Sequence, residues 1–367
     1  MDRLELLSRA KRVVVKIGSQ ILEKDDNIDR DFIESLVKQI KSFEDREFII
    51  VSSGAVLAGI KKLGLKSKPK SITEKQAIAS VGQASLIQVY DNIFSNYGIT
   101  IGQMLLTVEG LQDRRRYIYA KNTLNKLLDY KVVPIINEND AIAVSEIVFG
   151  DNDFLASHVA LMSDANLLII LSTAGGLYTD DPSNPDAKLI EFIDDIDKAL
   201  SFAKVSKSTY GSGGMRSKLE ASKIAVDHSI PVVIAPKSET IIVDILTGKN
   251  VGTFIYPSKK KQITKKKSWL KLLSSPKGKI YIDKGAEEAI KSGKSLLPSG
   301  IKEVEGIFKA GDVVAISDIE GNIIGKGLIN FDYRELNSIK GLRTNKAAEV
   351  LGKKVDEVIH IDNMVIF

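Results

Sequence analysis

The sequence predicts an α/β protein with an open, mostly parallel sheet, followed by a smaller domain of short strands. Up to about residue 256, continuous apolar, β-branched runs alternate with amphipathic helical patterns, which is typical of parallel strands covered by helices on both faces. After about residue 277, short strands alternate with Gly, Asp and Asn turns, as in small β-barrels. The length of 367 residues, 44% of them hydrophobic, is enough for two domains.

The first domain, residues 1–256, is expected to contain six strands. Their apolar runs cover residues 13–17, 48–51, 99–106, 132–136, 167–171 and 232–235. Helical periodicity predicts helices between them at residues 31–43, 72–97, 117–130, 154–162 and 216–228. Ligands of such sheets bind beyond the carboxyl ends of the strands, so residues that follow strands are the functional candidates.

Residues 257–276 form a basic connector with a proline at each end. Residues 245–282 hold ten lysines and no acidic residue, so the net charge of +5 leaves 5 − 10 = −5 for the rest of the chain. A solvated linker is favoured over a nucleic-acid contact, and Trp269 indicates that part of it packs against a domain.

The small domain is expected at residues 277–357, with a tail at 358–367. Its predicted strands cover residues 279–282, 313–316 and 323–328, and a short helix is expected at 286–292.

The composition excludes several classes of site. The chain has no cysteine, which rules out disulfides, thiolate metal sites and cysteine nucleophiles. Its three histidines, His158, His228 and His360, show no metal-ligand spacing. The N-terminus has no secretion-signal pattern and no apolar run is long enough to span a bilayer, so a cytoplasmic protein without membrane contact is expected.

Two glycine-rich segments, far apart in the chain, each place a lysine beside backbone that glycine leaves accessible to a ligand. Lys16 and Gly18 end the first strand, and a glycine turn opens the helix expected at 216–228. Each alone fits an ordinary turn. Together they favour a phosphate clamp in a chain without a Walker A sequence. The residues of the second segment are Ser212, Gly213, Gly214, Met215, Arg216, Ser217 and Lys218.

Polar residues follow two further strands. Ser53 stands at a helix start, where it serves either as an anion site or as a plain N-cap. Asn137 and Asp140 come directly after the apolar run 132–136. Their types suit an amino acid zwitterion, with Asp140 for the amino group and amides for the carboxylates. The alternative is a polar loop with Asx turns.

Asn152 and Asp153 precede the helix expected at 154–162. A capping role for Asn152 is natural. Asp153 fits two other roles, either lying between Lys16 and Lys218 to orient both or helping to hold Mg²⁺ through water.

These motifs, taken in order, carry a resemblance that covers nearly the whole chain. The runs VVVKIGS, VSSGAVLAG, VVPIINENDA, GDNDFLA and GSGGMRSKL, with DKGAEEAI in the small domain, resemble the glutamate 5-kinase family of the amino acid kinase superfamily, with a C-terminal PUA domain. The resemblance implies a three-layer α/β/α sandwich. It also implies transfer of the γ-phosphoryl group of ATP, with Mg²⁺, to the side-chain carboxylate of L-glutamate, the first step of proline synthesis.

By motif position, the resemblance implies a role for each candidate. Lys16 and Lys218 contact ATP phosphates, and Asp153 organises the reacting groups. Ser53, Asp140 and Asn152 bind glutamate, and Mg²⁺ is expected on the nucleotide phosphates. Ser172 and Thr173 join residues 212–218 in the nucleotide loops. Feedback inhibition by proline, a dimer or tetramer and glutamyl phosphate reductase as a partner are further expectations.

The chain departs from the family pattern at two places. After the run 167–171 the family often has Thr-Asp and then a lysine, whereas this chain has Ser172-Thr173-Ala174-Gly175. Gln20 stands where a small hydroxyl residue is common. Both departures concern the nucleotide contacts.

Two competing interpretations stay open at this level. Acetylglutamate, aspartate and uridylate kinases share the fold, but they usually lack a PUA domain. An RNA-binding protein would use the PUA domain and the lysine-rich connector, but it would leave the two-lysine site unexplained. RNA is kept as an accessory partner only.

Overall fold

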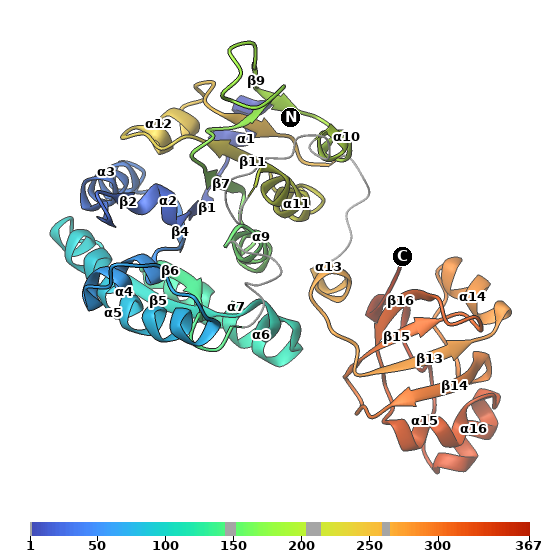
Figure 1. Cartoon of the computed structure of the whole chain (residues 1–367). Helices are drawn as coiled ribbons and strands as arrows, with labels where there is room; N and C mark the ends of the chain where they lie inside the picture. The colour runs from blue at the N-terminus through green and yellow to red at the C-terminus, as the bar shows by residue number, and fades with distance from the viewer. Residues whose placement is uncertain (1, 144–151, 203–213, 259–264) are drawn as a thin grey trace. The chain divides into compact units, whose positions relative to one another are not determined.

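The computed structural model describes residues 2–143, 152–202, 214–258 and 265–367, and the chain divides into two compact units (Figure 1). Unit 1 comprises Met1–Gly110 and Tyr117–Gln262. Unit 2 comprises Leu111–Arg116 and Ile263–Phe367. In the described ranges, no helix combines the length and the apolar character that crossing a membrane requires.

Unit 1 is built on an eight-stranded sheet in the spatial order β10-β12-β11-β7-β1-β4-β6-β5. Neighbouring strands are parallel except β11 and β12. All six predicted strands are confirmed. The structure adds β10 and β12 at one edge, which were missed because they are only two and three residues long. In spatial order the strands are Phe192–Ile193, Thr253–Ile255, Val232–Ala235, Leu167–Leu171, Arg12–Ile17, Glu47–Ser52, Val133–Glu138 and Ile101–Leu106.

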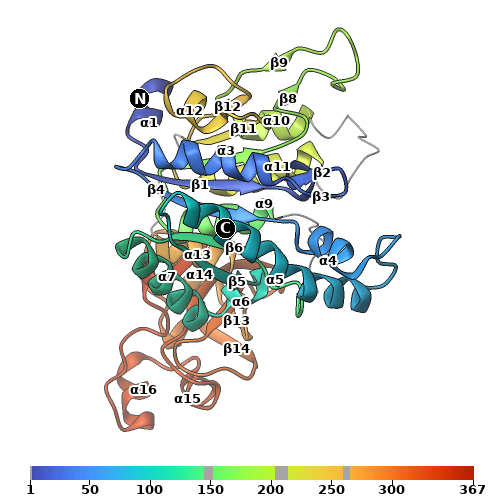
Figure 2. The ribbon, with the colours of Figure 1, turned by 90° about the vertical axis from the view of Figure 1, so that its left-hand side faces the viewer.

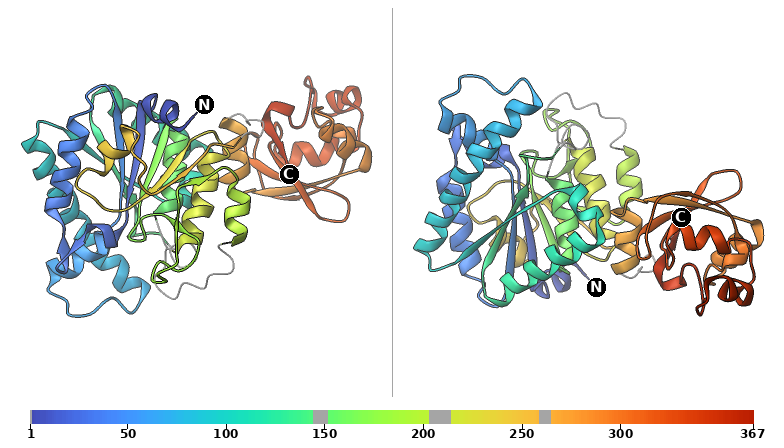
Figure 3. Two further views of the ribbon diagram at one scale, coloured as in Figure 1. Left: turned by 90° about the horizontal axis from the view of Figure 1, so that it is seen from above. Right: turned by 90° about the horizontal axis from the view of Figure 1, so that it is seen from below.

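Helices cover both faces of this sheet (Figures 2 and 3), which confirms the α/β/α sandwich. On one face, α3 (Arg30–Lys41), α5 (Ile72–Asn96) and α12 (Ile241–Leu246) share an apolar core with alternate residues of the strands. On the other face, α9 (Asp153–Met162) contacts β1 and β7, and α11 (Met215–Val226) contacts α9 and β11.

Shorter elements complete unit 1. The predicted helix at 117–130 is observed as α7, which begins slightly earlier. Two short hairpins, β2-β3 and β8-β9, lie outside the main sheet. The remaining elements are α1 (Arg3–Ser8), α2 (Ser19–Leu22), β2 (Glu23–Lys24), β3 (Asn27–Ile28), α4 (Ala55–Leu63), α6 (Val108–Gln112), α7 (Arg114–Asp129), β8 (Leu177–Tyr178), β9 (Leu189–Ile190) and α10 (Ile196–Phe202). The end of α6 and the first turn of α7 fall in the segment Leu111–Arg116, which belongs to unit 2.

Two glycines set how closely α4 and α5 cross. A Cβ atom on Gly82 of α5 would lie 1.8 Å from the carbonyl oxygen of Ala55, and one on Gly59 of α4 would lie 2.0 Å from that of Ile78. No side chain fits at either position, because both contacts are with backbone. The crossing therefore presses α5 against the first turn of α4, just beyond the carboxyl end of β4.

Unit 2 contains a five-stranded sheet in the order β14-β13-β15-β16-β17. Its strands are antiparallel except for the β13-β15 pair. The three predicted strands are confirmed as β13, β15 and β16, and the predicted helix as α14. In spatial order the strands are Ile301–Gly306, Gly278–Ile282, Val313–Ser317, Ile323–Leu328 and Met364–Ile366; the helices are α13 (Lys265–Leu272), α14 (Lys284–Lys291), α15 (Tyr333–Ile339) and α16 (Thr344–Leu351).

The basic connector and the tail are more structured than their composition indicates. Part of the connector is helix α13, in which Trp269 is only 2% exposed and its Nε1–H donates to the carbonyl oxygen of Leu111 at 3.0 Å. Part of the tail is β17, which pairs with β16. Short apolar runs, WL in the connector and MVI in the tail, supply the buried side chains.

Candidate active site

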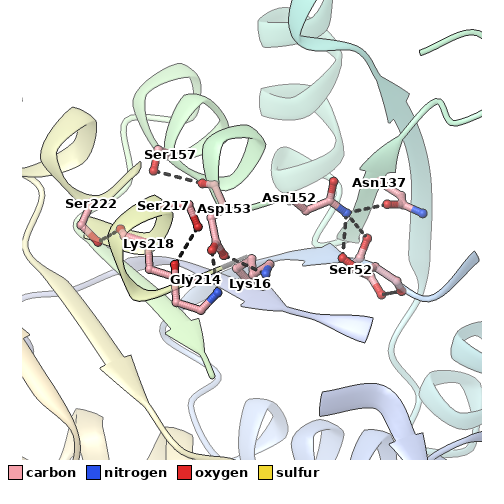
Figure 4. A network of polar contacts seen from close by, with 11 residues as sticks. Lys16, Ser52, Asn137, Asn152, Asp153, Ser157, Gly214, Ser217, Lys218 and Ser222 are labelled. Carbon is pink, nitrogen blue, oxygen red and sulfur yellow. Dashed lines mark hydrogen bonds and ion pairs between the residues drawn. The ribbon is translucent and has the colours of Figure 1, made fainter. Parts of the chain in front are cut away.

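Asp153 contacts two lysines from distant parts of the chain (Figure 4). Its Oδ1 lies 2.7 Å from the Nζ of Lys16, and its Oδ2 lies 2.9 Å from the Nζ of Lys218. The side chains of Asp153, Lys16 and Lys218 are 0%, 1% and 9% exposed. One carboxylate and two ammonium groups leave this buried triad with a charge of +1, which attracts an anion.

The alternation of side chains along β1 explains where Lys16 lies. Val13, Val15 and Ile17 belong to the apolar core shared with α3 and α5. Lys16 therefore faces the opposite side of the sheet, where α9 packs. Gly18 follows at the strand end, and a Cβ atom there would lie 3.3 Å from the Nζ of Lys16. A glycine thus avoids crowding the ammonium group.

Helix α11 brings Lys218 to Asp153, and a hydroxyl group of α9 holds α11 in place. Gly214 is the N-cap of α11, and the Oγ of Ser217 donates to its carbonyl oxygen at 2.7 Å. The Oγ of Ser157 on α9 donates to the carbonyl oxygen of Ala221 on α11 at 2.7 Å. The two lysines are therefore held by the main sheet and by two interlocked helices.

The glycine segment 212–218 lies only partly within the described ranges. Ser212 and Gly213 lie outside the described ranges. Met215 is half-buried at the start of α11, and the Arg216 side chain pairs with Glu220 at 2.9 Å on the exposed side of the helix. Their predicted part in ATP binding stays a prediction.

A second cluster, here called the amide cluster, consists of Ser53, Gln83, Asn137 and Asn152. The Nδ2 group of Asn152 lies 2.8 Å from the Oδ1 of Asn137, 3.0 Å from the Oγ of Ser53 and 2.9 Å from the carbonyl oxygen of Ser52 (Figure 4). The Nδ2 of Asn137 donates to the Oε1 of Gln83 at 2.8 Å. Asn137 and Asn152 are 2% and 9% exposed.

The structure thus brings three of the four predicted amino-acid-binding residues together and adds a fourth residue, Gln83. Asp140 lies half-buried two residues beyond the end of β6 and is outside the amide cluster. Sequence reasoning missed Gln83, because a glutamine inside a long helix has no distinctive pattern. Its neighbour Gly82, in the middle of the predicted helix, was the one clue to a close contact at that point.

The two clusters adjoin at the start of α9. Asn152 is the N-cap residue of α9 and Asp153 is its first helical residue. Three of the other partners, Lys16, Ser53 and Asn137, lie at the ends of the neighbouring parallel strands β1, β4 and β6. A buried cationic site and a polar amide site therefore lie one residue apart at the carboxyl edge of the sheet, where ligands of such folds bind.

Ser172 and Thr173 follow β7, two strands from β4. Ser172 is buried, and its N–H donates to the carbonyl oxygen of Ala235 at 2.9 Å, whereas Thr173 is exposed. The chain then turns at Gly175, whose φ of +73° favours glycine. Ser172 thus offers little side chain to a nucleotide, while Thr173 is accessible.

Comparisons with known proteins identify the two domains of the chain. The family model described as "Amino acid kinase family" matches residues 11–236, and the PUA domain model matches residues 278–351. A carbamate kinase from Giardia lamblia, solved with AMP-PNP, superposes with a TM-score of 0.50 over 68% of this chain and 100% of its own, at 17% identity, and supports the fold alone. The chain therefore belongs to the amino acid kinase family and has its fold.

Two relatives give a closer assignment. The glutamate 5-kinase of Aquifex aeolicus is 51% identical over 362 residues, which cover 97% of this chain and 99% of the relative. That of Carboxydothermus hydrogenoformans is 46% identical over 370 residues, with 99% of each chain covered. The chain belongs to the glutamate 5-kinase family.

Proposed function

We propose that this protein transfers the γ-phosphoryl group of ATP to the side-chain carboxylate of L-glutamate, giving L-glutamyl 5-phosphate, the first step of proline biosynthesis. The observation that carries the proposal is the pair of buried lysines on Asp153, placed one residue from the amide cluster. The names of the full-length relatives supply the substrate.

The reaction needs positioning and charge neutralisation more than proton transfer. The acceptor carboxylate is ionised near neutral pH and is itself the nucleophile, so no general base is required. Its oxygen forms a bond to the γ-phosphorus while the bond to the β-γ bridging oxygen breaks and ADP leaves. Lys16 and Lys218 each present an ammonium group to the charge on the transferring group, Lys218 from the ADP side.

Asp153 keeps the two ammonium groups close despite their mutual repulsion. Each ammonium group has three N–H donors, and Asp153 makes one contact with each group. Burial makes these interactions stronger than they would be in water. Lys16, Lys218 and Asp153 are therefore the proposed catalytic residues.

Three residues of the amide cluster, together with Asp140, are proposed to bind glutamate. Ser53, Asn137 and Asn152 offer hydroxyl and amide groups, and Asp140 offers a carboxylate for the α-amino group. ATP is proposed to contact Gly18, Ser172, Thr173 and the segment 212–218.

Mg²⁺ is proposed to be held mainly by phosphate oxygens and water. Within the described ranges, no group of three or more acidic or histidine side chains is placed to hold a metal ion. Both oxygens of Asp153 already contact ammonium groups. Mg²⁺ commonly keeps several of its waters and binds substrate phosphates, so it does not need a set of protein ligands. When bound, the ion supplies further positive charge to the phosphates.

The proposal extends to regulation and assembly. We expect inhibition by proline, assembly into a dimer or tetramer, transfer of the acyl phosphate to a glutamyl phosphate reductase and a cytoplasmic location. Titration with proline in the assay below and light scattering of the purified protein test the first two.

The decisive experiment measures ADP release with ATP, Mg²⁺ and L-glutamate, while hydroxylamine traps the acyl phosphate as a hydroxamate. Glutamate-dependent hydroxamate supports the proposal. Product with aspartate or N-acetylglutamate but not with glutamate would keep the reaction class and overturn the substrate. If no acceptor gives product, the kinase proposal fails.

A further inference from the structure

The hydrogen-bond directions in the amide cluster are fixed by two backbone groups. The N–H of Glu138 can only donate, and it donates to Asn137 at 2.8 Å, so the atom that it meets is the oxygen Oδ1. The carbonyl of Ser52 can only accept, so the atom of Asn152 that it meets is the nitrogen Nδ2. The two amides therefore have one consistent orientation each.

This orientation makes Gln83 necessary. With Oδ1 of Asn137 directed at Glu138 and Asn152, its Nδ2 group points to Gln83. Asn137 is 2% exposed, so water is a poor substitute acceptor for this group, and an unpaired buried N–H is costly. Among the described residues, the Oε1 of Gln83 is the one atom that accepts a hydrogen bond from Asn137 Nδ2.

Gln83 is also rigidly placed. It follows Gly82, where α5 is pressed against the backbone of Ala55 in the first turn of α4. Ser53 lies just before that turn. The close crossing of α4 and α5 thus fixes the distance between the backbone of Gln83 and that of Ser53.

We propose that Gln83 is a positioning residue for the acceptor substrate. It accepts from Asn137 Nδ2 and so stabilises the orientation in which Asn137 Oδ1 meets Asn152. It acts through Asn137 and not on the substrate. The inference rests on the proposed function, because Asn137 and Asn152 are the residues proposed to bind glutamate.

The test replaces Gln83 by methionine, which keeps the length of the side chain and removes the acceptor. Gln88→Met, at an exposed position of the same helix, is the matched control. Loss of one hydrogen bond predicts a rise in the KM for glutamate of roughly three- to tenfold. The kcat and the KM for ATP stay close to the parent values, because the lysine triad does not involve Gln83.

A double-mutant cycle separates positioning from a general structural effect. If Gln83 acts through Asn137, Gln83→Met causes no further rise in KM in an Asn137→Ala background. Calorimetric titration of each variant with glutamate, and its melting temperature, show whether each variant is folded. An unchanged KM in Gln83→Met, an additive effect in the double variant, or a joint loss of kcat, ATP affinity and melting temperature would each overturn the inference.

Failure of the proposed function gives a different result. In that case the parent protein forms no hydroxamate with glutamate, and the cycle is repeated with whichever acceptor is active. A KM effect of Gln83→Met on that acceptor, absent in the Asn137→Ala background, would support the positioning role while the substrate assignment fails.

Discussion

At the scale of single residues, the two oxygens of Asp153 each hold an ammonium group, one from β1 and one from α11. Two buried lysines alone would repel each other and lose their hydration. The shared carboxylate offsets part of both costs and leaves an excess positive charge at the place where a phosphoryl group would carry negative charge. The chemistry thus depends on a charge balance that any one of the three residues can upset.

Lys218→Met tests the role of the second lysine. The substitution keeps an unbranched side chain and removes the ammonium group, so kcat is expected to fall by about 10²- to 10³-fold. The KM for glutamate changes little, because the amide cluster is intact. Steady-state kinetics with glutamate and ATP check this.

The matched control for that variant is Lys223→Met, five residues further along α11. Lys223 pairs with Asp197 and Asp227 near the surface, and its loss leaves the triad unchanged. Near-normal turnover of Lys218→Met would contradict the catalytic role, and an equal loss in Lys223→Met would indicate damage to the helix itself.

The sequence predicts part of the site at this scale. A position between the two lysines was one of the two roles that the sequence suggested for Asp153, beside holding Mg²⁺ through water, and the structure has the geometry of the first. The hydrogen bond of Gln83 could not be predicted, because it depends on how closely two helices cross. That distance is a property of packing and not of local pattern.

At the scale of elements, helix α9 carries a buried histidine. Burial lowers the pKa of His158 to about 4, with a smaller contribution from His228. Its ordinary pKa is 6.5, so between these values the unfolded chain binds more protons than the folded chain. The stability contributed by neutral His158 is therefore complete above about pH 6.5 and is lost as the pH falls towards 4.

His158→Met removes this dependence. Between about pH 7.5 and pH 5 the parent is expected to lose roughly 2 kcal/mol of unfolding free energy through this group, and the variant loses correspondingly less over the same interval. Urea unfolding at both pH values measures the difference. Equal losses in the parent and the variant would show that His158 titrates normally.

The crossing of α4 and α5 provides another prediction at this scale. In Gly82→Ala the new methyl group would overlap the carbonyl oxygen of Ala55, so the helices must separate. Overpacking of this kind costs about 1–3 kcal/mol. Thermal unfolding should show a lower melting temperature, and the KM for glutamate should rise because Gln83 and Ser53 move apart.

Gly285→Ala is the control for that substitution. Gly285 is also helical, on α14, and its nearest neighbour to an added Cβ atom is 3.5 Å away. This variant should be unchanged or slightly more stable. If Gly82→Ala behaves in the same way, the crossing is not tightly packed.

Elements were predictable where their pattern was long. Continuous apolar runs located the six longer strands of the main sheet, most of them because parallel strands buried on both faces favour apolar residues. The strands β10 and β12 of the main sheet, and β17 of unit 2, are two or three residues long. Pairing with a neighbour, rather than their own composition, makes them strands.

At the scale of the whole molecule, unit 2 is discontinuous in sequence. Leu111–Arg116 belongs to it together with Ile263–Phe367. Within the unit, Trp269 donates to the carbonyl of Leu111, and the guanidinium of Arg114 lies 5.0 Å from its ring centroid. Since Trp269 is the one tryptophan of the chain, its fluorescence reports on this unit specifically.

Arg114→Ala should lower the unfolding free energy followed by tryptophan fluorescence by about 0.5–1 kcal/mol, the usual size of a cation–π contact. Arg115→Ala, an exposed neighbour, is the control. Urea titration of both variants makes the comparison. The same change in both would mean that the ring contact contributes nothing.

Asn152 and Asp153 are adjacent, so one peptide bond joins the amide cluster to the lysine triad. A ligand that shifts the first turn of α9 alters the amide cluster and the lysine triad together, since one peptide bond joins the two residues. Thermodynamic linkage then requires reciprocity. If bound glutamate changes the affinity for the nucleotide by some factor, the bound nucleotide must change the affinity for glutamate by the same factor.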